Sequence, residues 1–181
     1  MVKLNLDIDD VEMTFEIPSE WDDVTVEQFQ QLKSINESQY NLLELNVLYL
    51  SILAKIDKDF VYMMDSESFK KITDVLSFLN TEIQTEPAEN IVVDGVEYWL
   101  KKDFNQLTMG ESVSFEAILE QNDGDLERCI DKLLCIFLRK RKENGKLEAF
   151  KNDFLERSEV FKTIKITDVY NLFVFFLNGK I

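Results

Sequence analysis

The chain has no histidine among its 181 residues, and it has only five glycines. Histidine is the commonest general base and the commonest protein ligand for transition metals, so its absence disfavours both kinds of site. The glycines form neither a GxxxxGK[ST] nor a GxGxxG pattern, which argues against a loop that cradles phosphate. The sequence therefore predicts a protein that is not an enzyme, with no catalytic residue, no cofactor and no bound metal.

Cysteines and long apolar runs are also scarce. Cys129 and Cys135 are six residues apart, so on one helix they would lie about 240° apart and could neither pair nor share a metal. We expect buried, reduced thiols in a cytosolic setting. The most apolar run, 172–177, is far shorter than the ~20 residues of a membrane-spanning helix, and residues 1–10 do not resemble a signal peptide. We expect neither a membrane partner nor export.

Acidic residues outnumber basic ones by 35 to 20, which gives a formal net charge of −15. The acidic residues are spread along the chain, and their charge opposes direct binding to nucleic acid and to anionic lipid. Hydrophobic residues make up 45% of the chain, and 14 residues are phenylalanine. This apolar content is enough for one full core or for two small lobes.

The first elements predicted are a pair of strands followed by a capped helix. Residues 2–6 and 11–17 alternate in character, which is typical of strands. Thr25 and Gln28 have the spacing of a capping box, which predicts the start of a helix. Trp21 lies between strand and helix, where we expect it to fill the junction and stabilise the fold.

The segment 40–56 has helical spacing but is apolar on more than one side. One stripe follows the i, i+3, i+4, i+7 rule and consists of Leu45, Leu48, Tyr49, Ile52, Leu53 and Ile56. The stripe is widened by Leu42, Leu43, Val47 and Leu50. Such a helix must be covered on several sides, either by the rest of the fold or by another chain.

The stretch 81–90, TEIQTEPAEN, is polar and acidic and has the composition of a linker. We predict a single compact domain, 1–181, within which this stretch separates lobes 1–86 and 87–181.

The second half begins with a hairpin signal, Asp94-Gly95 between two apolar alternating runs. Thr108 and Glu111 then repeat the capping-box spacing and predict a further helix. A helix is expected over about 126–137. The basic run that follows, 139–146, is interpreted as a helix C-terminus where cations complement the dipole, rather than as a nucleic-acid site.

Two more helices are expected, over about 147–160 and from a Thr167 cap to Asn178. The last is apolar nearly all round, which indicates burial on every side. Its three phenylalanines are candidates for the core or for a contact between subunits: Phe173, Phe175 and Phe176.

A shift of 83 residues aligns the second half with the first. It places Trp21 on Phe104, Thr25 on Thr108 and Gln28 on Glu111. Either the unit is duplicated, or capped helices after hairpins look alike for common physical reasons. The predicted fold class is α+β, mostly helical, with two short β-hairpins, each followed by helices.

Three patches resemble small proteins encoded among the structural genes of tailed bacteriophages, crAss-like phages included. They are IPSEWDDVTVEQFQQL at 17–32, the stretch around LTMGESVSFEAIL at 104–119, and FLERSEVFKTIKITDVYNLFVFFLNGK at 154–180. The resemblance implies a virion or tail-assembly protein, present in the virion and in the host cytoplasm during assembly.

The functional prediction is a non-enzymatic phage structural or assembly protein that docks onto other virion or tail proteins. Its partners would be tail, ring, portal or cargo components in a multi-copy assembly. Two alternatives stay open: a tail-assembly chaperone absent from the mature particle, and an acidic inhibitor of a host nucleic-acid-binding protein, which the charge of −15 suggests.

Overall fold

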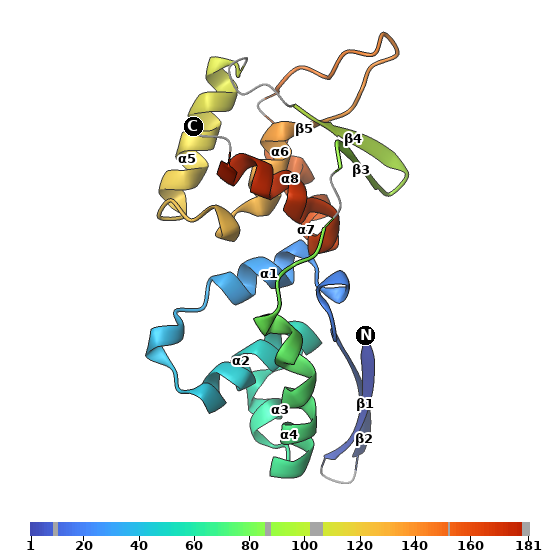
Figure 1. Ribbon diagram of the computed structural model, residues 1–181, viewed down its shortest axis with the longest axis vertical. Helices are drawn as coiled ribbons and strands as arrows, with labels where there is room; N and C mark the ends of the chain where they lie inside the picture. Colours follow the sequence, from blue (N-terminus) through green and yellow to red (C-terminus); the bar gives the residue numbers. More distant parts are fainter. Residues whose placement is uncertain (9–10, 86–87, 102–106, 152, 179–181) are drawn as a thin grey trace. The chain divides into compact units, whose positions relative to one another are not determined.

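The computed structural model describes residues 1–8, 11–85, 88–101, 107–151 and 153–178, with side chains except those of 4–8, 11–13 and 173–178. Within these residues the protein has a mixed α+β fold with eight α-helices and two small antiparallel sheets (Figure 1). The predicted fold class is confirmed.

The chain divides into two compact units. Unit 1 contains Met1–Val24 and Gln31–Gln84, and unit 2 contains Thr25–Gln30 and Thr85–Ile181.

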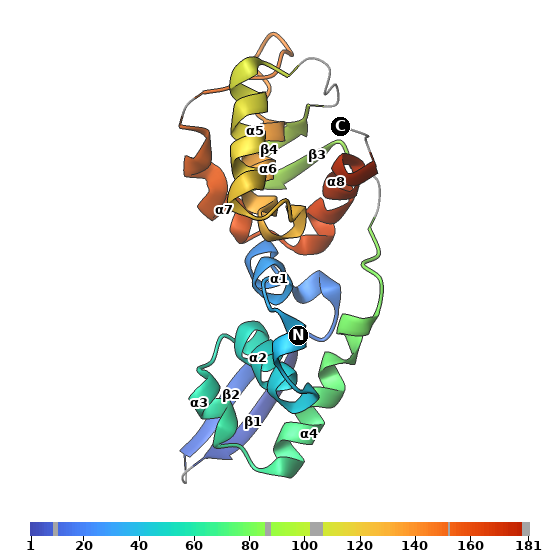
Figure 2. The same cartoon turned by 90° about the vertical axis from the view of Figure 1, so that its left-hand side faces the viewer.

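Unit 1 combines a two-stranded hairpin with short helices. Strands β1 (Val2–Ile8) and β2 (Val11–Ile17) are antiparallel and pair Val2 with Ile17. The helical elements in chain order are the 3-10 turn η1 (Trp21–Asp23), the end of α1 (Val26–Lys33), η2 (Glu37–Gln39), α2 (Leu42–Ala54), α3 (Lys58–Tyr62), α4 (Ser66–Val75) and η3 (Leu76–Asn80). Figures 1 and 2 show α2, α3 and α4 close to the hairpin.

Helix α2 is the central helix of unit 1, since it packs against β2, α3, α4 and η3. Asn41 and Glu44 form its capping box, and Lys55 ends it in the left-handed conformation. Its fully buried residues are Val47, Leu50 and Leu53. Of the predicted stripe, Leu53 is buried and the other five residues are half-buried, so burial extends beyond one side of the helix, as its broad apolar surface predicts.

Trp21 is half-buried at the end of the hairpin. Its Nε1 donates a hydrogen bond to the carbonyl of Thr81 at 2.9 Å, and its ring meets Phe78 edge-on with centroids 5.3 Å apart. Trp21 thus ties the start of unit 1 to the end of η3.

Unit 2 contains a three-stranded sheet in the order β3-β4-β5, formed by Asn90–Val93, Val96–Leu100 and Leu138–Arg139. Its helical elements are α5 (Met109–Gln121), η5 (Leu126–Arg128), α6 (Ile130–Phe137), η6 (Phe154–Arg157), α7 (Ser158–Lys162) and α8 (Ile166–Asn178). Asp94 and Gly95 both have positive φ in the β3–β4 turn, as the Asp-Gly signal predicts.

Helix α6 lies at the centre of unit 2 and packs against α5, α7 and η6. Nearly all its side chains are buried, and Phe137 meets Phe115 of α5 edge-on at 5.8 Å. The chain then leaves the helix and enters β5, which pairs with β4. The predicted helix C-terminus is confirmed for Arg139, which follows α6 closely and donates to the carbonyl of Cys135. Arg139 itself lies in a strand, however, and residues 140–146 are not helical.

The start of α1 belongs to unit 2. The Val26 amide donates to the carbonyl of Ile164 at 2.8 Å, and Thr25 forms an antiparallel bridge with Lys165. Phe29 meets Tyr170 edge-on at 5.8 Å. The start of α1 is thus part of unit 2, although unit 2 is built mainly from the second half of the chain.

Three predicted helix boundaries were wrong. Residues 147–151 are not helical, and helical turns begin at Phe154. Helix α8 starts at Ile166, so Thr167 lies inside it rather than at its cap. Leu126 lies in a separate 3-10 turn, and α6 begins only at Ile130. At 126–128 the Asp125 side chain accepts a hydrogen bond from the Glu127 amide, which favours a separate turn over a continuous helix.

The element boundaries follow the 83-residue shift: β2 and β4 end at Ile17 and Leu100, and α1 and α5 begin at Val26 and Met109. The packing differs, however, because β4 also pairs with β5, whereas the described partner of β2 is β1. The duplication stays a hypothesis.

Replacing Trp21 tests its role in unit 1. Trp21→Ala should lower the free energy of unfolding by about 2–3 kcal/mol, because the variant loses both the ring contact and the hydrogen bond. Trp21→Phe keeps a ring against Phe78 and should lose only about 1 kcal/mol. Denaturant unfolding measures both; equal stability of Trp21→Ala and the unchanged protein would show that the indole is not part of the core.

Candidate functional site

The structure separates the residues singled out from the sequence. Trp21 lies in unit 1, whereas Thr25 and Thr108 lie in unit 2. Both threonines form the expected capping boxes: the Gln28 amide donates to Thr25 Oγ1 at 3.2 Å, and the Glu111 amide donates to Thr108 Oγ1 at 3.3 Å. Phe104 lies outside the described residues, and so do the side chains of Phe173, Phe175 and Phe176. Among the predicted residues whose side chains the structure describes, Thr108 borders a charge cluster around Glu111.

A buried charge cluster links the first turn of α5 with the end of β4 and with β5. Glu111 is 2% exposed, and its Oε2 accepts hydrogen bonds from Lys101 Nζ at 2.6 Å and from the Thr108 amide at 2.7 Å. Its Oε1 pairs with Arg139 Nη2 at 3.4 Å. A single carboxylate therefore caps a helix and binds two cations.

Two arginines meet at the C-terminal end of α6. Arg139 Nη1 donates to the carbonyls of Cys135 at 2.6 Å and Leu138 at 3.0 Å. Arg157 donates to the same two carbonyls, at 2.8 Å to Cys135 and 3.1 Å to Leu138. The last carbonyls of a helix carry the negative end of its dipole, so two guanidinium groups stabilise this end.

The positive charge of this cluster exceeds its negative charge. Lys101, Arg139 and Arg157 are three cations, and Glu111 is the one carboxylate within ion-pair distance of any of them among the described residues. Carbonyl groups satisfy the hydrogen bonds of a guanidinium but do not neutralise its charge. The cluster therefore keeps a surplus of positive charge in a partly buried place.

The pKa shifts of Arg139 and Glu111 agree with the surplus of positive charge in the cluster. Burial, followed by the nearby charge of Arg157, lowers the pKa of Arg139 to about 10, and Glu111 opposes the shift. Burial alone would raise the pKa of Glu111, but hydrogen bonds from Lys101 and Thr108 outweigh it, so the pKa is lowered. Both groups are charged at neutral pH.

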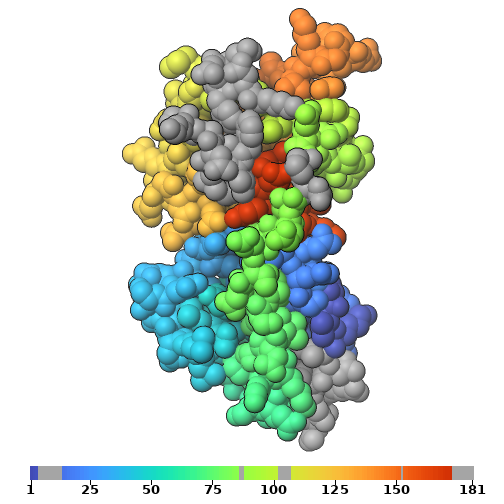
Figure 3. Space-filling view, viewed as in Figure 1, coloured from blue at the N-terminus to red at the C-terminus, as the bar shows by residue number. Residues whose placement is uncertain are grey.

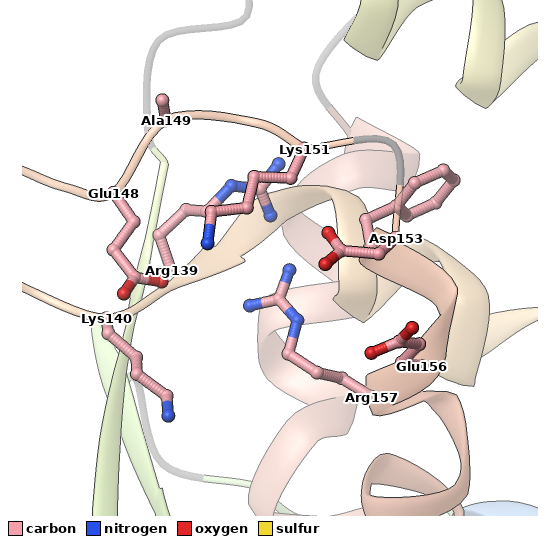
Figure 4. Close-up of a pocket in the computed structure, with 9 residues that line it drawn as sticks. Arg139, Lys140, Glu148, Ala149, Lys151, Asp153, Glu156 and Arg157 are labelled. Carbon is pink, nitrogen blue, oxygen red and sulfur yellow. The ribbon is translucent and has the colours of Figure 1, made fainter.

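An open pocket of about 220 Å³ adjoins the cluster, and we call it the arginine pocket. It is lined by Arg139, Lys140, Glu148, Ala149, Lys151, Asp153, Phe154, Glu156 and Arg157. Figure 4 shows the guanidinium groups of Arg139 and Arg157 and the carboxylate of Asp153 directed toward a common space. Arg139, only 2% exposed, forms part of the pocket wall and is held there by its buried hydrogen bonds.

A basic loop extends the pocket, and we call residues 140–148 the basic loop. Backbone hydrogen bonds join its two sides: the Lys142 amide donates to the Lys146 carbonyl at 2.8 Å, and the Glu148 amide donates to the Lys140 carbonyl at 2.9 Å. The guanidinium of Arg141 lies 3.4 Å from the centroid of the Trp99 ring, which holds this exposed cation in place. The loop, orange in Figure 3, projects from the surface of unit 2.

Sequence reasoning missed the arginine pocket as a site. The run RKRK was recognised as basic and was placed at a helix C-terminus, but the burial of its first member beside Glu111 was not predicted. A two-residue strand is too short to produce an alternating pattern. The available signal was the second capping box, since its Glu111 lies in the first turn of a helix near Lys101.

Other chemistry is limited among the described residues. No group of three or more Asp, Glu or Cys side chains there is arranged to hold a metal ion. No described helix combines the length and the apolar character needed to cross a membrane. Cys129 and Cys135 are free and buried, as predicted, and burial raises the pKa of each thiol to about 12.

Comparison with known proteins gives no relative: no family model, no curated protein and no solved structure matches the chain.

Glu111→Gln tests the charge cluster. The folded pKa of Glu111 lies below its ordinary value of 4.5, so its stabilising effect is complete above that value and is lost as pH falls through the folded pKa. The free energy of unfolding of the variant should be about 3 kcal/mol lower at neutral pH, because Arg139 stays buried without a carboxylate to pair with. Its stability should also depend less on pH in the acid range. Glu120→Gln, an exposed change on the same helix, is the control; an unchanged acid profile for Glu111→Gln would contradict the assignment.

The buried thiols predict slow alkylation. A pKa of about 12 leaves very little thiolate at mildly alkaline pH. Iodoacetamide should label the native protein at least about a thousandfold more slowly than the unfolded chain. Mass spectrometry over a denaturant series should show labelling only as unfolding proceeds, and rapid labelling of both cysteines without denaturant would contradict their burial.

Proposed function

We propose that the chain is a non-enzymatic bacteriophage structural or assembly protein that docks onto other virion or tail proteins in a multi-copy assembly. The phage assignment is supported by the three sequence patches at 17–32, 104–119 and 154–180. The docking role is supported by one structural observation, the uncovered apolar start of α2.

Leu42 and Leu43 occupy the first turn of α2 and are 75% and 61% exposed. Tyr40, just before the helix, is also exposed. The capping box of Asn41 and Glu44 fixes this turn, with hydrogen bonds of 3.0 and 2.9 Å between them. Large apolar side chains are therefore presented by a rigid turn rather than by a loose terminus.

The two sides of α2 explain this exposure. Val47, Leu50 and Leu53 fill the core of unit 1, whereas the two leucines of the first turn have no cover within the described fold. An exposed leucine is common on its own, but adjacent ones beside a tyrosine favour an interaction surface. Burying both leucines against a partner would contribute about 3 kcal/mol.

We propose that this first turn of α2 docks onto a neighbouring virion or tail protein. The partner would then cover the apolar side chains that the fold of unit 1 leaves exposed. An assembly with repeated copies fits a contact of this kind, because each copy presents the same rigid turn. The acidic charge keeps free copies soluble before they assemble.

The test combines co-purification with two matched variants. The tagged protein, expressed during phage infection, should retain virion or tail proteins that mass spectrometry identifies. Leu42→Ser/Leu43→Ser should reduce their recovery by about tenfold or more with little change in unfolding free energy, since both side chains are already exposed.

The control is Tyr62→Ser/Met63→Ser, which removes another exposed apolar pair from unit 1. It should leave recovery unchanged. Recovery of host nucleic-acid enzymes in place of phage proteins would contradict the proposal and favour the inhibitor alternative. The protein content of purified virions then separates a virion component, present in many copies, from an assembly chaperone, which would be absent.

A further inference from the structure

We infer that the arginine pocket is a binding site for a carboxylate side chain within an acidic segment of a partner protein. The inference rests on the proposed function, because it names the chemistry of a partner that docks. It concerns unit 2 and is independent of the apolar turn of α2.

The arginine pocket has a surplus of positive charge. Arg157 forms hydrogen bonds only to the carbonyls of Cys135 and Leu138 within the described residues, and no described carboxylate lies within ion-pair distance of it. Glu111 already serves both Lys101 and Arg139. A carboxylate from outside would find two guanidinium groups held in fixed positions, and paired guanidinium–carboxylate hydrogen bonds are among the strongest that proteins make.

The two guanidinium groups are preorganised for binding. Arg139 is buried and Arg157 is half-buried, and the carbonyl hydrogen bonds that fix them are present before any ligand arrives. The ordering cost that a flexible surface lysine would incur on binding is therefore largely absent. The phenyl rings of Phe150 and Phe154 lie nearby, with the Arg139 guanidinium 5.2 Å from the Phe150 centroid.

The charges that line the pocket favour a carboxylate as the ligand. The pocket is lined by four cations and three carboxylates, the latter being Glu148, Asp153 and Glu156. A net charge near +1 suits one carboxylate at a time. An acidic peptide can insert one carboxylate on a flexible side chain while its other carboxylates stay in solvent. The phosphates of a nucleic-acid strand lie in its backbone, so they would bring the strand against these carboxylates and the −15 charge of the chain. The charge distribution favours an acidic peptide.

Positive charge is concentrated around the pocket, where it can steer an acidic partner. The segment 139–157 holds seven basic and four acidic residues, so it carries +3 while the remainder of the chain carries −18. On the basic loop, Lys142 and Lys146 are exposed and form no ion pair with a described carboxylate. Concentrated positive charge at one place on an acidic protein orients an approaching acidic segment toward that place.

The experiment measures binding of a fluorescent decaglutamate peptide to the full-length protein by anisotropy. The key variant is Lys151→Glu, because Lys151 is exposed, lines the pocket and has no described ion-pair partner to lose. It should weaken binding by about tenfold or more. Arg157→Gln should do the same, and its unfolding curve shows whether loss of the carbonyl hydrogen bonds also affects the fold.

The matched control is Lys70→Glu, an equal charge reversal at an exposed lysine of α4 in unit 1. It should change binding by less than about twofold, since screened surface charges outside the site contribute little. Equal losses for Lys151→Glu and Lys70→Glu, or no binding by the unchanged protein, would overturn the inference. Tighter binding of a decathymidylate strand than of decaglutamate would overturn it in favour of nucleic acid.

The outcome is distinguishable from that of the proposed function. If phage proteins co-purify through Leu42 and Leu43 while decaglutamate does not bind, the docking function stands and the pocket assignment fails. If decaglutamate binds in the pocket but no phage protein co-purifies, the pocket stands and the phage function fails.

Discussion

The interaction on which unit 2 depends is the one made by the carboxylate of Glu111. It caps the first turn of α5, receives Lys101 from the end of β4 and pairs with Arg139 of β5. A helix, a hairpin strand and a third strand are thereby held at one buried point. Removing charges from water is costly, and such a cluster persists only where hydrogen bonds satisfy its members. Here backbone carbonyls at the end of α6 supply those bonds, with Arg157 as a second donor.

The same arrangement produces the binding site. Because the carbonyls orient both guanidinium groups without neutralising them, the fold retains positive charge in a pocket whose walls are fixed. Unit 1 contains a different kind of surface, in which a rigid helix start presents two leucines. One surface is charged and the other apolar. Under the two proposals, the first would recognise a partner by charge complementarity and the second by apolar burial.

Sequence patterns predicted the fold class, both hairpins and both capping boxes, because these depend on residues close together in the chain. Thr25 with Gln28 and Asp94 with Gly95 have local partners, so their roles are visible without tertiary structure. The burial of Arg139 was not predictable in this way. It depends on β5 pairing with β4, on Glu111 from another element and on Arg157 from a third. The sequence of α2 did not specify which side is most deeply buried for a related reason, since a helix that is apolar on most sides does not reveal which side meets the core.

The most direct test of this account follows the arginine side chains themselves. Nitrogen-edited NMR of the Nε–Hε groups during titration with decaglutamate reports which guanidinium groups meet a carboxylate. The account predicts saturable shifts of the Arg157 and Arg139 signals, with those of Arg128 unchanged because its side chain already pairs with Asp125 at 3.0 Å. Shifts distributed equally over all arginines, or confined to the exposed Arg141, would contradict the claim that the buried cluster forms the binding site.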